Sequence, residues 1–347
     1  MTGWNHPPGP LPPGPLPPGA GNAAPGQWPG MTMGQILDRV FRLLRAHFEL
    51  YVGLAIVPGL AVLSMIVVLG GLAALRFFSL LRHHSAPPNL WSLLWLVPVG
   101  IAFYIAIFIV YALYAAAASY AVVRNNWGQP VSAAEAWAVA WRRGGSYVWL
   151  TFLIVLIVGG PVYVVLGLGA GVMALTAVNA HSSGAPFIGL AFMPMFMLLN
   201  LGTQVYMVLM FLRYGLAFPA SVMEDLPAVA ALRRSASLTR GGKGRIFVVL
   251  LVMYAASFIL ILVCEMILFF VVGMGVFAVS LAHVSWHSPL LLFIFAPLGL
   301  LVMLAVILAV VSLPYAGYTT AFGILYCDQW MRVDGAAPPL PAAGGQA

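Results

Sequence analysis

Long apolar stretches separated by short basic segments dominate this chain. Six of them are long enough to cross a bilayer, since a transmembrane helix needs about 20 predominantly apolar residues. They cover about residues 50–75, 91–123, 147–180, 186–221, 246–282 and 289–326. This pattern predicts an all-α integral membrane protein with six transmembrane helices.

Several of these stretches exceed the hydrocarbon thickness of about 30 Å at a helical rise of about 1.5 Å per residue. We therefore expect tilted spans, helices that project beyond the bilayer, or breaks at Gly159-Gly160-Pro161 and from Gly273 to Gly275. An alternative segmentation divides one long stretch into a span and a re-entrant piece, which changes the helix count.

The two ends of the chain are rich in proline, glycine and alanine. Residues 1–30 and 332–347 are predicted to be disordered tails that flank a membrane domain at residues 31–331. The first tail repeats Pro-Pro-Gly-Pro-Leu units, which favour extended polyproline conformations. It is therefore either a tether or a ligand for an aromatic groove on a protein partner.

Composition supports the membrane class. The chain is 63% apolar and 7% charged, against roughly 45 to 50% and 25% in soluble domains. The two cysteines, Cys264 and Cys327, indicate no disulfide framework.

The basic residues predict an orientation. Thirteen of the 15 lysines and arginines flank the spans on one side, and only Arg76 and Arg82 fall on the other. Basic loops stay in the cytoplasm, so we expect a multi-pass protein of the cell membrane with both termini cytoplasmic. This face is expected to bind anionic lipid headgroups rather than nucleic acid. Its residues are Arg39, Arg42, Arg142, Arg143, Arg233, Arg234, Arg240 and Lys243.

A short segment with an apolar stripe precedes each pair of spans. Thr32 with Gln35 and Ser132 with Glu135 match a helix capping box, and Asp225 opens the third segment. We expect three hairpin repeats around an axis along the membrane normal, each preceded by a cytoplasmic amphipathic helix in the headgroup plane. The predicted units are about residues 32–124, 132–221 and 225–331.

Two of these loops carry a family resemblance. One is Gly34-Gln35-Ile36-Leu37-Asp38-Arg39, and the other runs from Glu224-Asp225 through Ala231-Leu232-Arg233-Arg234-Ser235-Ala236-Ser237-Leu238-Thr239-Arg240. They resemble loops of bacterial membrane proteins related to the membrane domain of glycerophosphoryl diester phosphodiesterases. The resemblance covers about residues 31–331, although only the two loops are distinctive.

The resemblance does not imply diesterase activity. That family is named for members in which a separate soluble domain carries the catalytic site, and we expect no such domain here. The His-Arg-Gly and Glu-Asn-Thr type motifs of that domain are missing from the sequence. We therefore expect a protein that is not an enzyme.

Direct searches for chemistry give the same expectation. The Gly241-Gly242-Lys243-Gly244 segment lacks the spacing of a phosphate-binding loop, and no nucleophile elbow or zinc motif is present. We predict no catalytic residues, no cofactor and no metal site. Histidines of the three outer loops leave zinc or copper as an unfavoured alternative; they are His83, His84, His181, His283 and His287.

Glu265 is the sharpest candidate within the membrane. A carboxylate at this depth costs a few kcal/mol, about 2.5 or more, unless it is paired or protonated. It could bind a cation, relay a proton or hydrogen-bond to Asn200, Thr203 or Gln204 of the fourth span.

Three function classes remain. The sequence favours a non-enzymatic membrane component that organises lipid or protein partners at the cytoplasmic face. The alternatives are a small-molecule or ion transporter with a polar site at Glu265, and an intramembrane enzyme of lipid metabolism. Oligomeric state is open.

Overall fold

The computed structural model describes residues 30–82, 96–178, 185–281 and 289–335, and every regular element in these ranges is a helix. Six segments are long and apolar enough to cross a membrane. They are Phe48–Ala73, Val97–Asn126, Gly144–Thr176, Phe192–Met223, Lys243–Phe270 and Val302–Asp334. The predicted six-span, all-α architecture is confirmed, and the chain is a multi-pass membrane protein.

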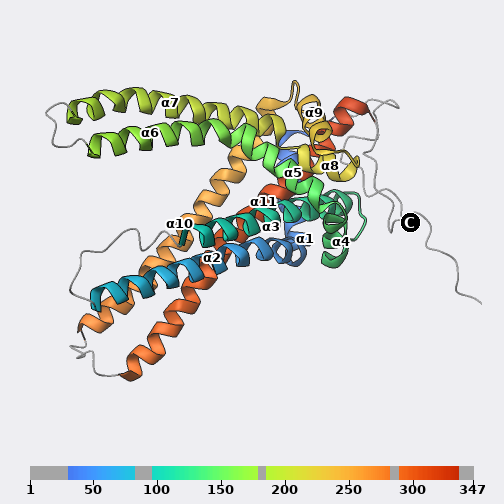
Figure 1. Ribbon diagram of the computed structural model, residues 1–347. Coiled ribbons are helices and arrows are strands. Elements are labelled where there is room, and N and C mark those ends of the chain that lie inside the picture. The colour runs from blue at the N-terminus through green and yellow to red at the C-terminus, as the bar shows by residue number, and fades with distance from the viewer. Residues whose placement is uncertain (1–29, 83–95, 179–184, 282–288, 336–347) are drawn as a thin grey trace, which may run out of the picture.

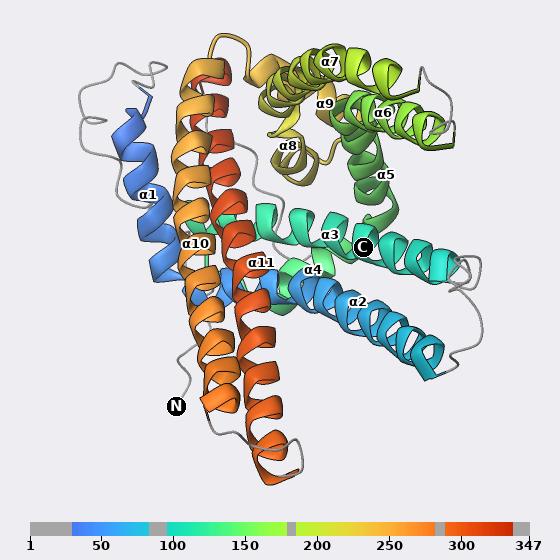
Figure 2. The same cartoon turned by 90° about the vertical axis from the view of Figure 1, so that its left-hand side faces the viewer.

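The spans form three hairpins that extend from a common packed region (Figures 1 and 2). The first hairpin is α2 (Phe48–Arg82) and α3 (Leu96–Asn126). The third is α10 (Lys243–Leu281) and α11 (Pro289–Asp334). The second leads outward through α5 (Gly144–Ile154), the π-helix η3 (Val155–Gly159) and α6 (Gly160–Val178), and returns through α7 (Ala185–Tyr214) and α8 (Ala217–Met223).

Three short helices precede the hairpins: α1 (Met33–Ala46), α4 (Ala133–Arg142) and α9 (Ala228–Leu238). We call the end of the spans where these helices lie the converging end. Helix α11 continues to Asp334, beyond the predicted end of the membrane domain at residue 331. The N-terminal tail, the three outer loops with their histidines, and residues 336–347 lie outside the described residues.

One of the two predicted helix breaks is present. The π-helix η3 ends at Gly159, directly before Gly160 and Pro161, and the Tyr206 hydroxyl donates to the Ile157 carbonyl at 3.0 Å. The break predicted from Gly273 to Gly275 is wrong, since α10 is continuous there. Glycine, unlike proline, keeps its backbone N–H and can stay in the helical hydrogen-bond ladder.

The packed core occupies the converging end. Fully buried side chains include Tyr51 of α2, Tyr114 of α3, Ile246 of α10 and Tyr326 of α11. Farther out the helices expose large apolar side chains, and Phe269 is 77% exposed. Lipid tails solvate such side chains as well as other helices do, so these surfaces suit a bilayer.

Helix α11 is central because glycines let its neighbours approach closely. A Cβ on Gly59 of α2 would lie 2.5 Å from the Ser312 hydroxyl of α11, and one on Gly323 of α11 would lie 2.4 Å from Cγ1 of Val122 in α3. Small residues at such crossings increase van der Waals contact between transmembrane helices.

The short helices pack inward on the spans. Thr32 and Gln35 form the predicted capping box of α1, and Ser132 accepts the Glu135 amide at the start of α4. Helix α1 buries Ile36 and Val40 against the bundle, chiefly α11. Their apolar stripes therefore serve partly as core.

The third short helix begins later than predicted. Helix α9 starts at Ala228 with Pro227 at its N-cap, so Asp225 is not its capping residue. Asp225 instead has a positive φ of 54°. It occupies the turn between α8 and α9.

The Gly323 contact gives a stability prediction. In Gly323→Ala, the new methyl group forces α3 and α11 apart, and we expect a loss of about 1 to 3 kcal/mol, measured by thermal or denaturant unfolding in detergent. Gly34→Ala is the control, because no atom lies within 4 Å of a Cβ there. Equal stability of the two variants would contradict the close α3–α11 packing.

Candidate functional site at the converging end

Asp328 on α11 is fully buried and joins the two ends of the described chain. Its Oδ2 accepts Arg245 Nη2 at 2.9 Å and Arg332 Nε at 3.0 Å. Its Oδ1 accepts the backbone N–H of Met31 at 2.9 Å, and Arg332 Nη2 donates to the Met31 carbonyl at 3.0 Å. Gly30 has a φ of 65°, and a Cβ there would lie 2.0 Å from the Arg332 guanidinium.

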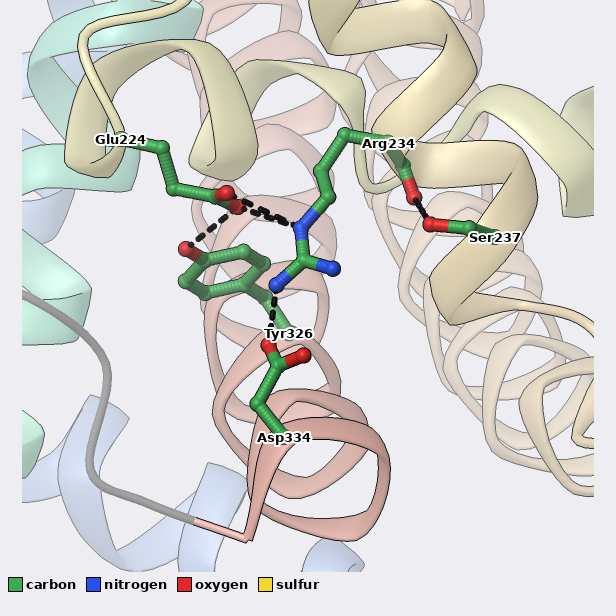
Figure 3. Close-up of polar contacts among 5 residues, drawn as sticks. All are labelled: Glu224, Arg234, Ser237, Tyr326 and Asp334. Atoms are coloured by element: carbon green, nitrogen blue, oxygen red, sulfur yellow. Dashed lines mark hydrogen bonds and ion pairs between the residues drawn. The ribbon is translucent and has the colours of Figure 1, made fainter.

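A second cluster surrounds Arg234 of α9 (Figure 3). Its Nε donates to both Glu224 carboxylate oxygens, at 3.1 and 2.9 Å, and its Nη2 donates to Asp334. The Tyr326 hydroxyl donates to Glu224 Oε1 at 3.2 Å. The guanidinium carbon lies 4.3 Å from the centre of the Trp330 ring. The cluster therefore ties the α8–α9 connection to the end of α11.

Burial acts differently on the two charges. It raises the pKa of Glu224, and the hydrogen bonds from Arg234 and Tyr326 only partly oppose this. Burial lowers the pKa of Arg234, but its bonds to Asp334 and Glu224 outweigh that effect and leave the pKa raised. Arg234 thus remains a cation, while Glu224 takes up a proton more readily than an exposed glutamate.

A third cluster joins α3 to the segment before α4. Arg124 Nη1 donates to Glu135 Oε1 at 2.7 Å, and Arg124 Nε donates to Gln129 at 2.8 Å. The Tyr120 hydroxyl also donates to Glu135, at 2.7 Å. Because Arg124 is buried, this pair fixes α4 against the end of the first hairpin.

The predicted lipid-binding residues divide into two groups. Arg39 donates to Asn126 at 2.6 Å, Arg143 pairs with Asp225, and Arg234 pairs as above. Arg42 is exposed and pairs with Asp38 at 3.0 Å. The others are exposed and form no ion pair within the part of the chain that the structure describes; they are Arg142, Arg233, Arg240 and Lys243.

Sequence reasoning missed the carboxylates that organise this end. The sequence does not single out Asp328 and Asp334. A buried polar cluster of Glu224 with Arg233 or Arg234 was an alternative that the sequence did not favour, and the structure pairs Glu224 with Arg234. Composition alone pointed to these residues. The chain has only 8 acidic residues against 15 basic ones, so each acidic residue has a high chance of pairing with an arginine.

The intramembrane candidates do not meet. Glu265 lies on an exposed face of α10, whereas Asn200 and Gln204 are partly buried on α7. Within the described residues, no hydrogen bond joins Glu265 to Asn200, Thr203 or Gln204.

Among the residues that the structure describes, no group of three or more His, Cys, Asp or Glu side chains could hold a metal ion. What the converging end offers chemically is a set of internal ion pairs with unpaired cations outside them. No protein-family model, curated protein or solved structure matches the chain.

Asp328 gives a second stability prediction. Asp328→Asn leaves the Arg245 and Arg332 guanidinium groups partly buried without a carboxylate, and we expect a loss of about 3 to 5 kcal/mol in detergent unfolding. The control is Asp38→Asn, which breaks an exposed pair and should cost at most about 1 kcal/mol. Similar losses in the two variants would show that burial of Asp328 is unimportant.

Glu224 gives a pH prediction. Because its folded-state pKa lies above that of the unfolded chain, the folded state binds more protons between the two values. Its contribution to stability is therefore greatest below the unfolded pKa, about 4.5, and declines as the pH rises through the raised folded value. As the pH falls through the range between these two pKa values, the wild-type protein should become more stable relative to Glu224→Gln. The measurement is melting temperature against pH for both proteins, and a constant difference would refute it.

Proposed function

We propose that this protein is a non-enzymatic component of the cell membrane that organises anionic lipids and protein partners at its cytoplasmic face. The observation that carries the proposal is the distribution of charge at the converging end. Five carboxylates at this end form ion pairs with arginines of the same chain; they are Glu135, Glu224, Asp225, Asp328 and Asp334. The exposed cations are left free for phosphate groups.

Aromatic and apolar side chains accompany these cations. Phe41 of α1 and Phe48 at the start of α2 are 44% and 50% exposed, and Trp141, directly before Arg142, is 66% exposed. Amphipathic surfaces that combine exposed aromatic and basic residues bind the headgroup region through apolar burial and charge attraction. This combination supports a membrane-facing surface over one that faces only water.

Orientation is part of the proposal. With six spans, both termini lie on the same side of the membrane, and the converging end carries nearly all the basic residues of the chain. Cytoplasmic loops retain Lys and Arg, which supports a cytoplasmic converging end. The inner leaflet of a cell membrane carries anionic lipids that attract such a surface.

The three-fold repeat is also proposed, and one recurring contact supports it. Arg39 bonds Asn126, Arg143 pairs with Asp225, and Arg234 pairs with Asp334. In each case the arginine lies in the short helix or directly after it, and the acceptor lies at the end of the second span of the hairpin that follows, or within two residues of that end. Three hairpins would then be anchored to their short helices in the same way.

Family resemblance fits this structural role. In the longer of the two loops, Glu224 and Arg234 pair, and the Ser235 hydroxyl donates to the Arg213 carbonyl at 2.9 Å. In the shorter loop Ile36 is buried and Arg39 bonds α3. The residues that carry the resemblance thus hold the converging end together, which supports membership of a family of membrane domains without diesterase activity.

The test is lipid binding by the exposed cations. Replacing Arg142, Arg233, Arg240 and Lys243 with glutamine should weaken apparent affinity for phosphatidylglycerol by at least ~10-fold, since each basic residue near an anionic surface contributes about 1 kcal/mol. Native mass spectrometry of the detergent-purified protein, titrated with phosphatidylglycerol or phosphatidylcholine, measures this preference. High salt should reduce it as well.

The matched control keeps the charge: Arg142→Lys, Arg233→Lys and Arg240→Lys together should retain the preference. Because all four positions are exposed and unpaired in the described structure, neither variant should lose stability. If the neutralised protein still prefers phosphatidylglycerol to the same degree, the proposed lipid-binding role fails.

A further inference from the structure

The second hairpin differs from the other two because both of its legs are interrupted. The π-helix η3 separates α5 from α6, and a turn at Gly215 and Leu216 separates α7 from α8. By contrast, α2, α3, α10 and α11 are each one continuous helix over the residues described. Bulges and breaks of this kind are where long helices bend, and π-bulges occur frequently at functional sites.

Beyond these interruptions the hairpin packs mainly on itself. Phe196 of α7 lies against Gly169 of α6, where a Cβ would be 2.2 Å from the ring, and it stacks on Phe192. Figures 1 and 2 show the outer parts of α6 and α7 apart from α10 and α11. Exposed positions such as Met197 at 69% and Leu198 at 72% lie along α7. The pair therefore forms an arm attached at its base.

Contacts at the base set the level of α7 against α10. Gly215 packs on Phe322 of α11. Along α11, Phe322 lies between two residues that contact α10: Asp328 pairs with Arg245, and Gly317 lies against Met253. Gly215 is thus level with the stretch of α10 between Arg245 and Met253.

Measured outward along their helices from this level, Asn200 of α7 and Glu265 of α10 lie at similar distances. Asn200 is about 22 Å beyond Gly215 at about 1.5 Å per residue, and Glu265 is about 18 to 30 Å beyond the matching stretch of α10. Helices α7 and α10 are already in contact. If α7 lay alongside α10, Asn200 would be at about the same height as Glu265 along the two helices.

Neither polar side chain is satisfied as the structure stands. Glu265 is exposed on a helix that spans the membrane, and among the residues described neither it nor the Asn200 side chain has a hydrogen-bond partner. An uncompensated carboxyl group at this depth is unfavourable, so ionisable residues within spans face other protein or a polar cavity.

We propose that α6 and α7 form a hinged arm that pivots at η3 and Gly215 and closes on α10, where Asn200 and Glu265 hydrogen-bond. The arrangement described here is the open one. Closure removes Glu265 from lipid and covers the exposed face of α10. The two interruptions give the arm its freedom, and the Tyr206–Ile157 hydrogen bond keeps its two legs together.

The experiment measures distances between spin labels on the full chain in lipid nanodiscs, with Cys264→Ala and Cys327→Ala as background. Labels at Met197→Cys and Met266→Cys, both on exposed positions, should give a short-distance population beside the long distance of the open arrangement. Glu265→Ala and Asn200→Leu should each lower the ratio of short to long by about fivefold, the equivalent of one interhelical hydrogen bond.

Three controls separate closure from general loosening. Glu265→Gln should keep most of the short population, and Val263→Ala, a neighbouring exposed position, should leave it unchanged. A label pair within the arm, at Leu168→Cys and Leu198→Cys, should give one distance in every variant.

Two outcomes overturn the proposal. A single long distance that no variant alters would show that the arm is fixed. The second outcome comes from protein labelled only at Met266→Cys. A short distance between two such molecules that disappears in Glu265→Ala would show that a second copy covers Glu265 instead.

Discussion

The buried carboxylate of Asp328 is the interaction on which the converging end depends. It holds two guanidinium groups and a backbone N–H, and so it joins the start of α1 to α10 and α11. In a bilayer, apolar side chains gain little by leaving lipid for one another, and association rests on close packing and hydrogen bonds. Packing accordingly concentrates where α11 carries both Asp328 and the glycines that admit its neighbours. Beyond that region the hairpins separate.

This arrangement also determines the charge of the surface. With 8 acidic against 15 basic residues, the chain cannot neutralise all its arginines. Most of its carboxylates pair with arginines, and several of these arginines, such as Arg234 and Arg245, hold helices together. The cations left over are the exposed ones, and they make the same end both the structural anchor and the surface best suited to anionic partners.

Much of the architecture could be predicted from sequence because apolar length and periodicity are local signals. The six spans, the Thr32 capping box and the η3 interruption follow from such signals. Predictions failed where distant contacts decide the outcome. Asp225 looks like a helix cap, yet it takes a positive φ and pairs with Arg143 from another helix. The sequence also shows no sign that Arg39, predicted to bind lipid headgroups, hydrogen-bonds Asn126 of α3.

The sequence alone therefore determined the membrane class, the number of spans and the excess of basic residues at one end, since each depends on the order of residue types along the chain. Only tertiary structure decided which arginines are free and where Glu265 faces. Ion pairing and exposure depend on separations in space between residues up to hundreds of positions apart, such as Met31 and Asp328. No local pattern encodes those separations, because helix crossings and hairpin directions set them.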